Sequence, residues 1–300
     1  MPSHKRPHAS DESLVIKPVP IPVTAKHPPP PRGGSVLPHH EFTMGLIAPK
    51  GSGKTTTICN ILDFMRGYFH MITIISPTLK NDEKWLWVRR QALLAENKAL
   101  RKFMERHNRL ADTVVGKPTV LESDKPFDPK IPEDQFMTEY DEDVFKSMIE
   151  EQNAMIDRIT ALGGTKHLAY RWLVILDDLV GSKLFNNRRQ NPFKMANTNH
   201  RHISLSMLQV SQAYREIPKT VRTNWTCLIL FEIANDAEVK TVYEEYSMGL
   251  KFDEWLKVYQ YCTEGDFDFM YINVDKPKRL RIMKNFDQYV FIDRDEHPDT

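Results

Sequence analysis

The segment Ala48-Pro49-Lys50-Gly51-Ser52-Gly53-Lys54-Thr55-Thr56 constrains the fold of this chain more than any other stretch. It follows the apolar run 42–47, which has the pattern of a strand, and it precedes residues 55–66, which have the pattern of a helix. It matches the phosphate-binding pattern G-x-x-x-x-G-K-[ST] with an alanine in place of the first glycine. A loop at this place points backbone N–H groups at a polyphosphate, and the helix N-terminus adds partial positive charge.

The residue types in this loop predict individual roles. Gly51 and Gly53 allow the main chain to approach phosphates closely, Lys54 supplies a full positive charge, and the Thr55 hydroxyl would ligate Mg²⁺. Lys50 either contacts a phosphate or is a solvated lysine. We therefore expect the loop to bind nucleotide through Ala48, Pro49, Lys50, Gly51, Ser52, Gly53, Lys54, Thr55 and Thr56.

Further short apolar runs follow at 71–76, 172–176, 203–210 and 226–233. Apolar runs bounded by turn residues and separated by helical patterns predict an α/β fold with a central, mostly parallel sheet. We expect helices over 237–246 and 252–261, a closing hairpin near residue 275, and a helical insertion over 83–165.

The first 40 residues differ in composition from the rest, because ten prolines are interleaved there with Lys, Arg and His. Such a segment buries too little apolar surface to offset its ordering entropy. We expect a disordered tail over 1–40, a nucleotide-binding P-loop domain over 41–290 and a flexible end over 291–300.

Composition excludes several classes of protein. No apolar run approaches the roughly 20 residues that a membrane span needs, and no secretory signal is visible. Three widely spaced cysteines argue against a disulfide framework and a zinc cluster. We expect an intracellular protein, and the net charge of +1 leaves its partners open.

Two acids, Asp177 and Asp178, end the apolar run 172–176. Carboxylates at the C-terminal edge of a parallel sheet would face the phosphate loop, where Asp177 would hold Mg²⁺ and Asp178 would activate the attacking water. The segment Asp178-Leu179-Val180-Gly181 also fits the D-x-x-G pattern of GTPases, but no N-K-x-D motif follows it. A third interpretation is an acidic turn without catalysis.

Polar residues also follow the run 203–210, where Ser211 and Gln212 lead to Ile217-Pro218 and then to Val221-Arg222-Thr223-Asn224. With the phosphate loop and the two acids, this order of motifs resembles the poxvirus-type genome-packaging ATPases of large DNA viruses, within the FtsK/HerA superfamily of P-loop NTPases. The resemblance spans about residues 42–290 and implies a RecA-like core.

The resemblance also implies site roles. Gln212 takes the role of a γ-phosphate sensor, and an arginine is contributed in trans to a neighbouring subunit. Arg222 is the first choice for that arginine, with Arg188 and Arg189 behind it; a structural or DNA-contacting role for Arg222 stays open. Asp178 stands where cellular members of the superfamily usually carry Glu, which puts its role as a base in question.

Two functions from different classes fit these motifs. The first, implied by the resemblance, is a ring of five or six subunits that uses ATP and Mg²⁺ to pump double-stranded DNA into a capsid, with a capsid or portal protein as partner. The DNA backbone could contact three basic stretches: Lys183 with Arg188 and Arg189, Lys194 with His200 and Arg201, and 276–284. The alternative is a nucleotide-binding regulatory or scaffold protein without processive movement on DNA.

Overall fold

The computed structural model describes residues 27, 30–89, 135–161, 166–179, 182–185 and 191–291. Its centre is a nine-stranded sheet with the order β3-β2-β4-β5-β1-β6-β7-β8-β9. The strands are β1 (Thr43–Ile47), β2 (Met71–Ile75), β3 (Phe136–Met137), β4 (Trp172–Asp177), β5 (Leu205–Ser211), β6 (Cys227–Leu230), β7 (Met270–Asn273), β8 (Ile282–Lys284) and β9 (Gln288–Tyr289). The expected apolar runs are all strands, and the expected C-terminal hairpin is β7 and β8.

The sheet is parallel from β3 to β6 and antiparallel from β6 to β9. Every residue of β1, β4 and β5 is buried, which explains why these strands are largely apolar. The buried polar residues Ser206 and Gln209 of β5 are hydrogen-bonded to His40 and Asn197. The expectation of an α/β fold with a mostly parallel sheet is confirmed.

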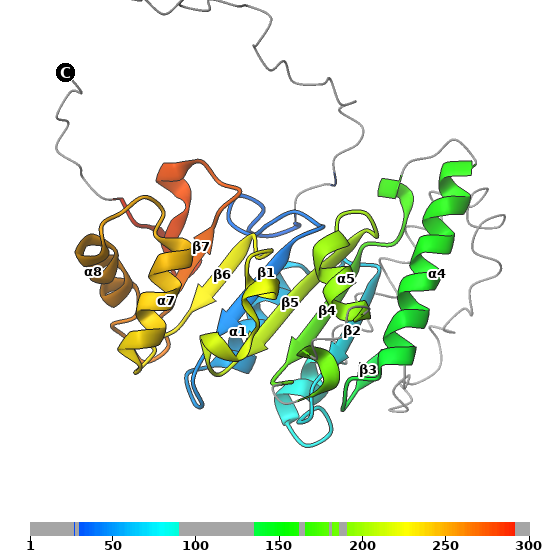
Figure 1. Ribbon diagram of the computed structural model, residues 1–300, viewed down its shortest axis with the longest axis horizontal. Coiled ribbons are helices and arrows are strands. Elements are labelled where there is room, and N and C mark those ends of the chain that lie inside the picture. The colour runs from blue at the N-terminus through cyan, green and yellow to red at the C-terminus, as the bar shows by residue number, and fades with distance from the viewer. Residues whose placement is uncertain are drawn as a thin grey trace, which may run out of the picture.

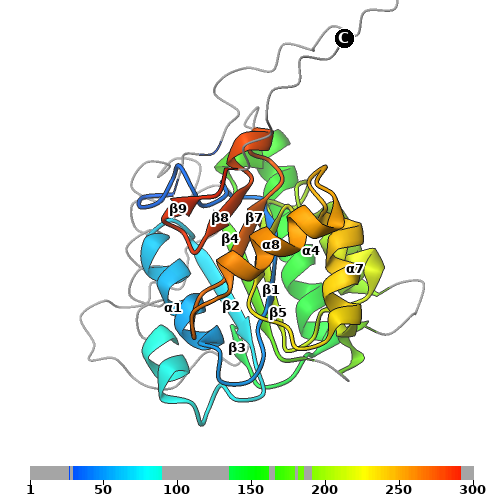
Figure 2. The same cartoon turned by 90° about the vertical axis from the view of Figure 1, so that its left-hand side faces the viewer.

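Helices cover both faces of this sheet, as the edge view shows (Figure 2). The α-helices are α1 (Lys54–Phe64), α4 (Glu142–Ala161), α5 (Pro192–Asn199), α6 (Lys219–Arg222), α7 (Asp236–Tyr246) and α8 (Phe252–Cys262). Short 3-10 turns are η3 (Lys166–Leu168), η4 (Lys183–Phe185), η5 (Tyr214–Glu216) and η6 (Lys278–Leu280). Helices α4, α5, α7 and α8 pack on one face, and α1 packs on the other with a helical segment at 83–89 (Figure 1).

Strand order decides where the polar strand ends meet. Strand β5 lies between β1 and β4 and is parallel to both, so all three point their C-terminal ends to the same edge. Ligands of open α/β sheets bind at this edge. The phosphate loop, the acids after β4 and Gln212 after β5 are thereby brought together.

The expected helical insertion contains α4, and it also contains a strand that the sequence did not predict. Residues Phe136 and Met137 pair with β2 and extend the sheet by one strand. Two residues are too few to show a period, so the pattern could not reveal them. Residues 90–134 lie outside the described part of the chain, and with them much of the expected insertion.

The expected tail needs a correction at its C-terminal end. Residues 30–40 pack on the domain, and the Leu37 side chain is buried in the core beside α1. A single leucine among prolines and glycines forms no periodic pattern in the sequence, but in the folded protein Leu37 packs against apolar side chains of the core. Residues 1–26, 28, 29 and 292–300 lie outside the described part. In the described residues, no helix has both the length and the apolar character to cross a bilayer.

Candidate active site

The loop between β1 and α1 has the backbone conformation that its glycines predict. Gly51 and Gly53 have φ angles of 88° and 96°, in the left-handed region that favours glycine. Gly53 is the N-cap of α1, and its carbonyl accepts a hydrogen bond from the Thr57 N–H at 2.9 Å. The Ser52 hydroxyl donates to the Pro49 carbonyl at 2.8 Å, which tightens the turn. The first N–H groups of α1 are thus presented at the edge of the sheet.

Lys54 lies against both acids of the β4 strand end. Its Nζ is 3.3 Å from Asp177 Oδ1 and 3.6 Å from Asp178 Oδ2. These residues are more than 120 positions apart in the chain, so only the fold brings them together. The acids therefore lie on the same side of the sheet edge as the loop lysine, as the sequence predicted.

Asp177 is almost fully buried, and the Ser76 hydroxyl donates to its Oδ2 at 2.8 Å. Burial raises the pKa of the Asp177 carboxyl, and the Lys54 ammonium and the Ser76 hydroxyl partly offset this rise. Apart from Lys54, Oδ1 has no partner among the described residues. A buried carboxylate oxygen left open toward a phosphate loop is suited to a hard cation, and the Thr55 side chain lies in the same cleft. The residues present therefore fit Mg²⁺.

Asp178 adopts a left-handed backbone conformation with φ 54°, which is uncommon for a residue other than glycine. This turn directs its carboxylate to Gln212, whose Nε2 donates to Asp178 Oδ2 at 2.7 Å. The amide and the acid come from neighbouring strand ends, β5 and β4. Gln212 therefore contacts the second acid directly.

These side chains line an open cleft of about 1260 Å³. Eight of the nine expected loop residues, Pro49 to Thr56, line it with Asp177, Asp178 and Gln212. Ala48 does not, because it is fully buried and its N–H donates to the Ser211 carbonyl at 3.1 Å. A small residue at position 48 is needed for packing beneath the loop rather than for contact with a ligand.

Arg222 does not lie in this cleft, and its contacts favour the structural role that the sequence left open for it over the role in trans. Its guanidinium is almost completely buried, pairs with Glu245 at 2.7 Å and lies 4.4 Å over the Tyr214 ring. It also donates to the carbonyls of Tyr214 and Ile217. A side chain engaged in this way points into its own domain and is not exposed for contact with a neighbouring subunit. The sequence around Arg222 could not predict this ion pair, because Glu245 is more than 20 residues away in the chain. Arg188 and Arg189 lie outside the described residues.

Several residues that line the cleft or hold its acids were not predicted, among them Ser76, which bonds to Asp177. Ser76 immediately follows β2, so the strand-end argument that found Asp178 and Gln212 could also have found it. Lys84 donates from Nζ to Thr56 Oγ1 at 3.1 Å, and it comes from the insertion, where no motif marks it. The cleft also includes aromatic and polar residues after α8 and β8, namely Phe267, Asp268, Phe269, Asn285, Phe286 and Asp287.

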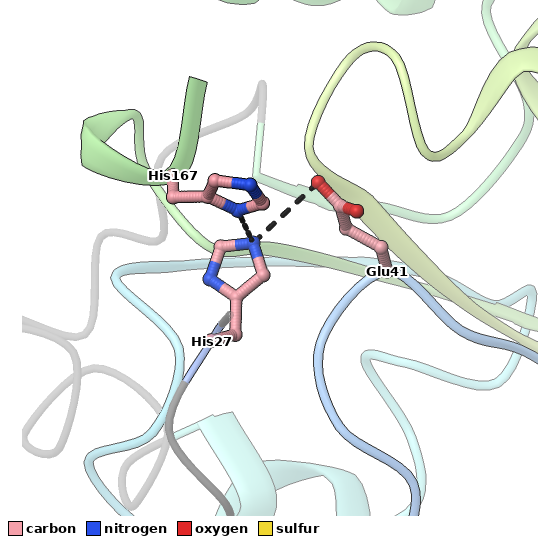
Figure 3. Close-up of side chains that lie close together, drawn as sticks. All are labelled: His27, Glu41 and His167. Carbon is pink, nitrogen blue, oxygen red and sulfur yellow. Dashed lines mark hydrogen bonds and ion pairs between the residues drawn. The ribbon is translucent and has the colours of Figure 1, made fainter. Parts of the chain in front are cut away.

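A second polar cluster lies away from this cleft (Figure 3). His27 Nε2 is 3.0 Å from His167 Nδ1 and 3.5 Å from Glu41 Oε1, so the three could offer ligands to a metal ion. However, Lys166 Nζ already lies 2.9 Å from Glu41 Oε1 and 3.1 Å from its Oε2. This ammonium already neutralises the Glu41 carboxylate. We therefore interpret the cluster as a set of polar contacts that joins the N-terminal segment to the domain.

Comparisons with known proteins bear on the part of the chain after the phosphate loop. Residues 131–262 match the family model "Poxvirus A32 protein", a segment from β3 to α8 that includes both acids and Gln212. Uncharacterized protein 075L of Invertebrate iridescent virus 6 is 29% identical over 138 residues. That match covers 45% of this chain and spans about half (49%) of the length of the relative.

Solved structures with a similar arrangement are distant in sequence. The genome packaging NTPase B204 of Sulfolobus turreted icosahedral virus 2, in complex with AMPPCP, is 13% identical with a TM-score of 0.47, over 81% of this chain and 96% of that one. The pCW3 conjugation coupling protein TcpA is 11% identical with the same TM-score, over 86% of this chain and 62% of that one. The match over residues 131–262 confirms the resemblance of this chain to the poxvirus-type genome-packaging ATPases.

Proposed function

We propose that the protein is an ATP-driven translocase that packages a double-stranded viral DNA genome into a capsid. The observation that carries the hydrolytic part is the convergence of Lys54 with Asp177 and Asp178 at the mouth of one cleft, with Gln212 bonded to the second acid. A loop that binds phosphate needs only the lysine. A second acid beside it supplies the proton acceptor that hydrolysis requires.

Each residue has a separate task in this proposal. Lys54 and the N–H groups of the loop bind the β- and γ-phosphates, and Thr55 with Asp177 would hold Mg²⁺, which when bound neutralises charge on the phosphate oxygens. Ser76 keeps the Asp177 carboxylate in one orientation. Asp178 accepts a proton from the water that attacks the γ-phosphate. Gln212, bonded to Asp178, responds when the γ-phosphate leaves.

The shorter arm of Asp178, compared with glutamate, is the main departure from the superfamily. The left-handed backbone at this residue supports its role, because it turns the carboxylate toward Lys54 and Gln212 at once. Strain of this kind costs about 1–3 kcal/mol and is found where the surrounding structure fixes a functional side chain.

Assembly as a ring of five or six subunits fits the composition of the cleft. The cations that line it in the described part of the chain are Lys50, Lys54 and Lys84, and no arginine is among them. A transition state with charge on three phosphate oxygens is commonly stabilised by an arginine, and a neighbouring subunit could supply it. Arg188 and Arg189 are the remaining candidates for that arginine.

Contacts with DNA and capsid rest on the family resemblance. Each of the three basic stretches has an exposed cation to which a phosphate backbone could bind without base recognition, namely Lys183 in the first, Arg201 in the second, and Lys278 and Arg279 in the third. In the second stretch, His200 is buried and is not available to DNA. Only the resemblance to the matched family supports a capsid or portal protein as a partner.

ATP hydrolysis with and without linear double-stranded DNA tests the function. We expect turnover that needs Mg²⁺ and rises with double-stranded DNA. Asp178→Asn should lower turnover by about 10² to 10⁴-fold, because it removes the proton acceptor, while ATP binding is retained. Lys54→Ala should abolish detectable ATP binding.

The matched control is Asp253→Asn, which removes an exposed acid of α8 that lies outside the cleft. Turnover of this variant should equal that of the wild type. Asp178→Asn with normal turnover would show that another group takes the proton. Hydrolysis that ignores DNA, with no ring in the presence of ATP, would favour the regulatory or scaffold function instead.

A further inference from the structure

An exposed aromatic side chain lies against the phosphate loop. Phe267 is 67% exposed, yet a Cβ atom added to Gly53 would be only 3.2 Å from its ring. The residue follows α8 in the chain, more than 200 positions after the loop. Single exposed apolar residues are common on protein surfaces, but this one forms part of the wall of the nucleotide cleft.

The segment that carries Phe267 is held in place by polar contacts from β8. Asp268 accepts a hydrogen bond from Asn285 Nδ2 at 3.0 Å and pairs with Lys284 Nζ at 2.9 Å. The Phe269 N–H donates to Asn285 Oδ1 at 3.1 Å. The two residues after Phe267 are therefore fixed, so the ring is displayed at the cleft by an ordered backbone.

More aromatic rings continue the wall beyond Phe267. The Phe286 ring is edge-on to Phe64 of α1 at 6.2 Å and to Phe269 at 5.0 Å. Asn60 and Asp287 are exposed and line the same part of the cleft. We call this part, made of Asn60, Phe64, Phe267, Phe286 and Asp287, the base lobe.

The base lobe has no task in phosphate chemistry, because it offers aromatic surface with a few polar groups. That combination suits a flat heteroaromatic ring, which stacks on an aromatic face and hydrogen-bonds at its edge. Phosphates need cations and N–H groups, and the loop already supplies these. The volume of the cleft, about 1260 Å³, also exceeds what a triphosphate alone would fill.

We infer that the base lobe binds the purine base of the nucleotide, with Phe267 stacking on it. The inference rests on the proposed function, since it names the part of the ligand that lies beyond the phosphates. Stacking on one aromatic ring changes affinity by roughly fivefold to a hundredfold.

Calorimetric titration with Mg²⁺ and two ligands, ATP and inorganic tripolyphosphate, tests it. Wild-type protein should bind ATP more tightly than tripolyphosphate. Phe267→Ala should weaken ATP binding by at least about fivefold and leave tripolyphosphate binding unchanged. Phe267→Tyr, which keeps the ring, should restore most of the difference. Phe291→Ala is the control, because Phe291 is 63% exposed and does not line the cleft.

The two proposals fail in different ways in this experiment. If Phe267→Ala binds ATP as the wild type does, the base lobe is overturned while the phosphate site stands. Equal loss of both ligands in Phe267→Ala also overturns it, since the ring would then support the loop and not the base. If the wild type binds neither ligand, the proposed function fails and the base lobe fails with it.

Discussion

At the scale of single residues, two basic side chains that the sequence predicted to act on nucleotide lie in opposite environments. Lys54 is partly accessible and lies between two acids at the cleft, whereas Arg222 forms an ion pair with Glu245 inside the domain. The two side chains differ in their burial. A charge at an open edge can exchange its protein partner for a ligand, but a buried guanidinium with four acceptors around it cannot do so without a large desolvation cost.

Replacing Arg222 should therefore lower stability rather than turnover. We expect Arg222→Ala to reduce the free energy of unfolding by about 3 kcal/mol, because the half-buried Glu245 carboxylate loses its cation and the packing of the buried Arg222 is lost. Urea denaturation measures this. Arg215→Ala, at an exposed position nearby, should cost less than about 1 kcal/mol.

A normally stable Arg222→Ala protein with impaired turnover would contradict the structural role and return the arginine to the list of trans candidates. Mixing it with an Asp178→Asn subunit separates the cases further. An arginine that acts on a neighbour can be complemented in a mixed ring, and a structural one cannot.

At the scale of elements, the site depends on how closely β1 fits between its neighbours. Gly45, in the middle of β1, is registered with Gln209 of β5 and Leu228 of β6. A Cβ at position 45 would lie 2.4 Å from the Trp225 ring, whose Nε1 donates to Gln209 Oε1 at 2.9 Å. The absence of a side chain at Gly45 thus leaves space for the Trp225 ring, which packs on β1 and hydrogen-bonds to β5.

Gly45→Ala should destabilise the protein by about 1–3 kcal/mol or more, since the added methyl group overlaps a buried ring. Thermal and urea unfolding measure the effect. Trp225→Leu supplies the matched test: with the ring removed, the cost of Gly45→Ala should fall, so that the double variant is more stable than additivity predicts. Strict additivity would mean that the two residues do not touch.

At the scale of the whole molecule, the N-terminal segment is fastened to the domain by histidines as well as by Leu37. His40 is fully buried, its Nε2–H donates to the Ser204 carbonyl at 3.0 Å, and its Nδ1 accepts from the Ser206 hydroxyl at 2.8 Å. The second bond requires the neutral imidazole, because Nδ1 can accept a hydrogen bond only while it carries no proton. Burial, with the nearby His27 and Arg171, holds the pKa of His40 well below its ordinary value of 6.5.

This depressed pKa fixes the sign of a pH effect. Below pH 6.5 the unfolded state takes up a proton that the folded state does not, so stability is full above this pH and falls as the pH decreases. The slope from one such group reaches about 1.4 kcal/mol per pH unit. Urea denaturation between pH 5 and pH 7 measures it.

His40→Gln should flatten this dependence, because an amide can donate and accept without titrating. A residual slope is expected, since the pKa values of His167 and His200 are also lowered, chiefly by burial. Exposed His39 gives the control, and His39→Gln should leave the slope unchanged. An equal slope in His40→Gln and wild type would show that His40 does not stay neutral in the folded protein.

The sequence by itself determined the strand–loop–helix unit, the two acids after β4 and the polar end of β5, because each is written in contiguous residues with a local pattern. It also determined the parallel sheet, since strands that are buried on both faces are largely apolar. Only the tertiary structure decided that β5 lies between β1 and β4, that Glu245 holds Arg222 and that Phe267 lies on Gly53. Those contacts join residues far apart in the chain, and no local pattern records which distant partner a side chain will meet.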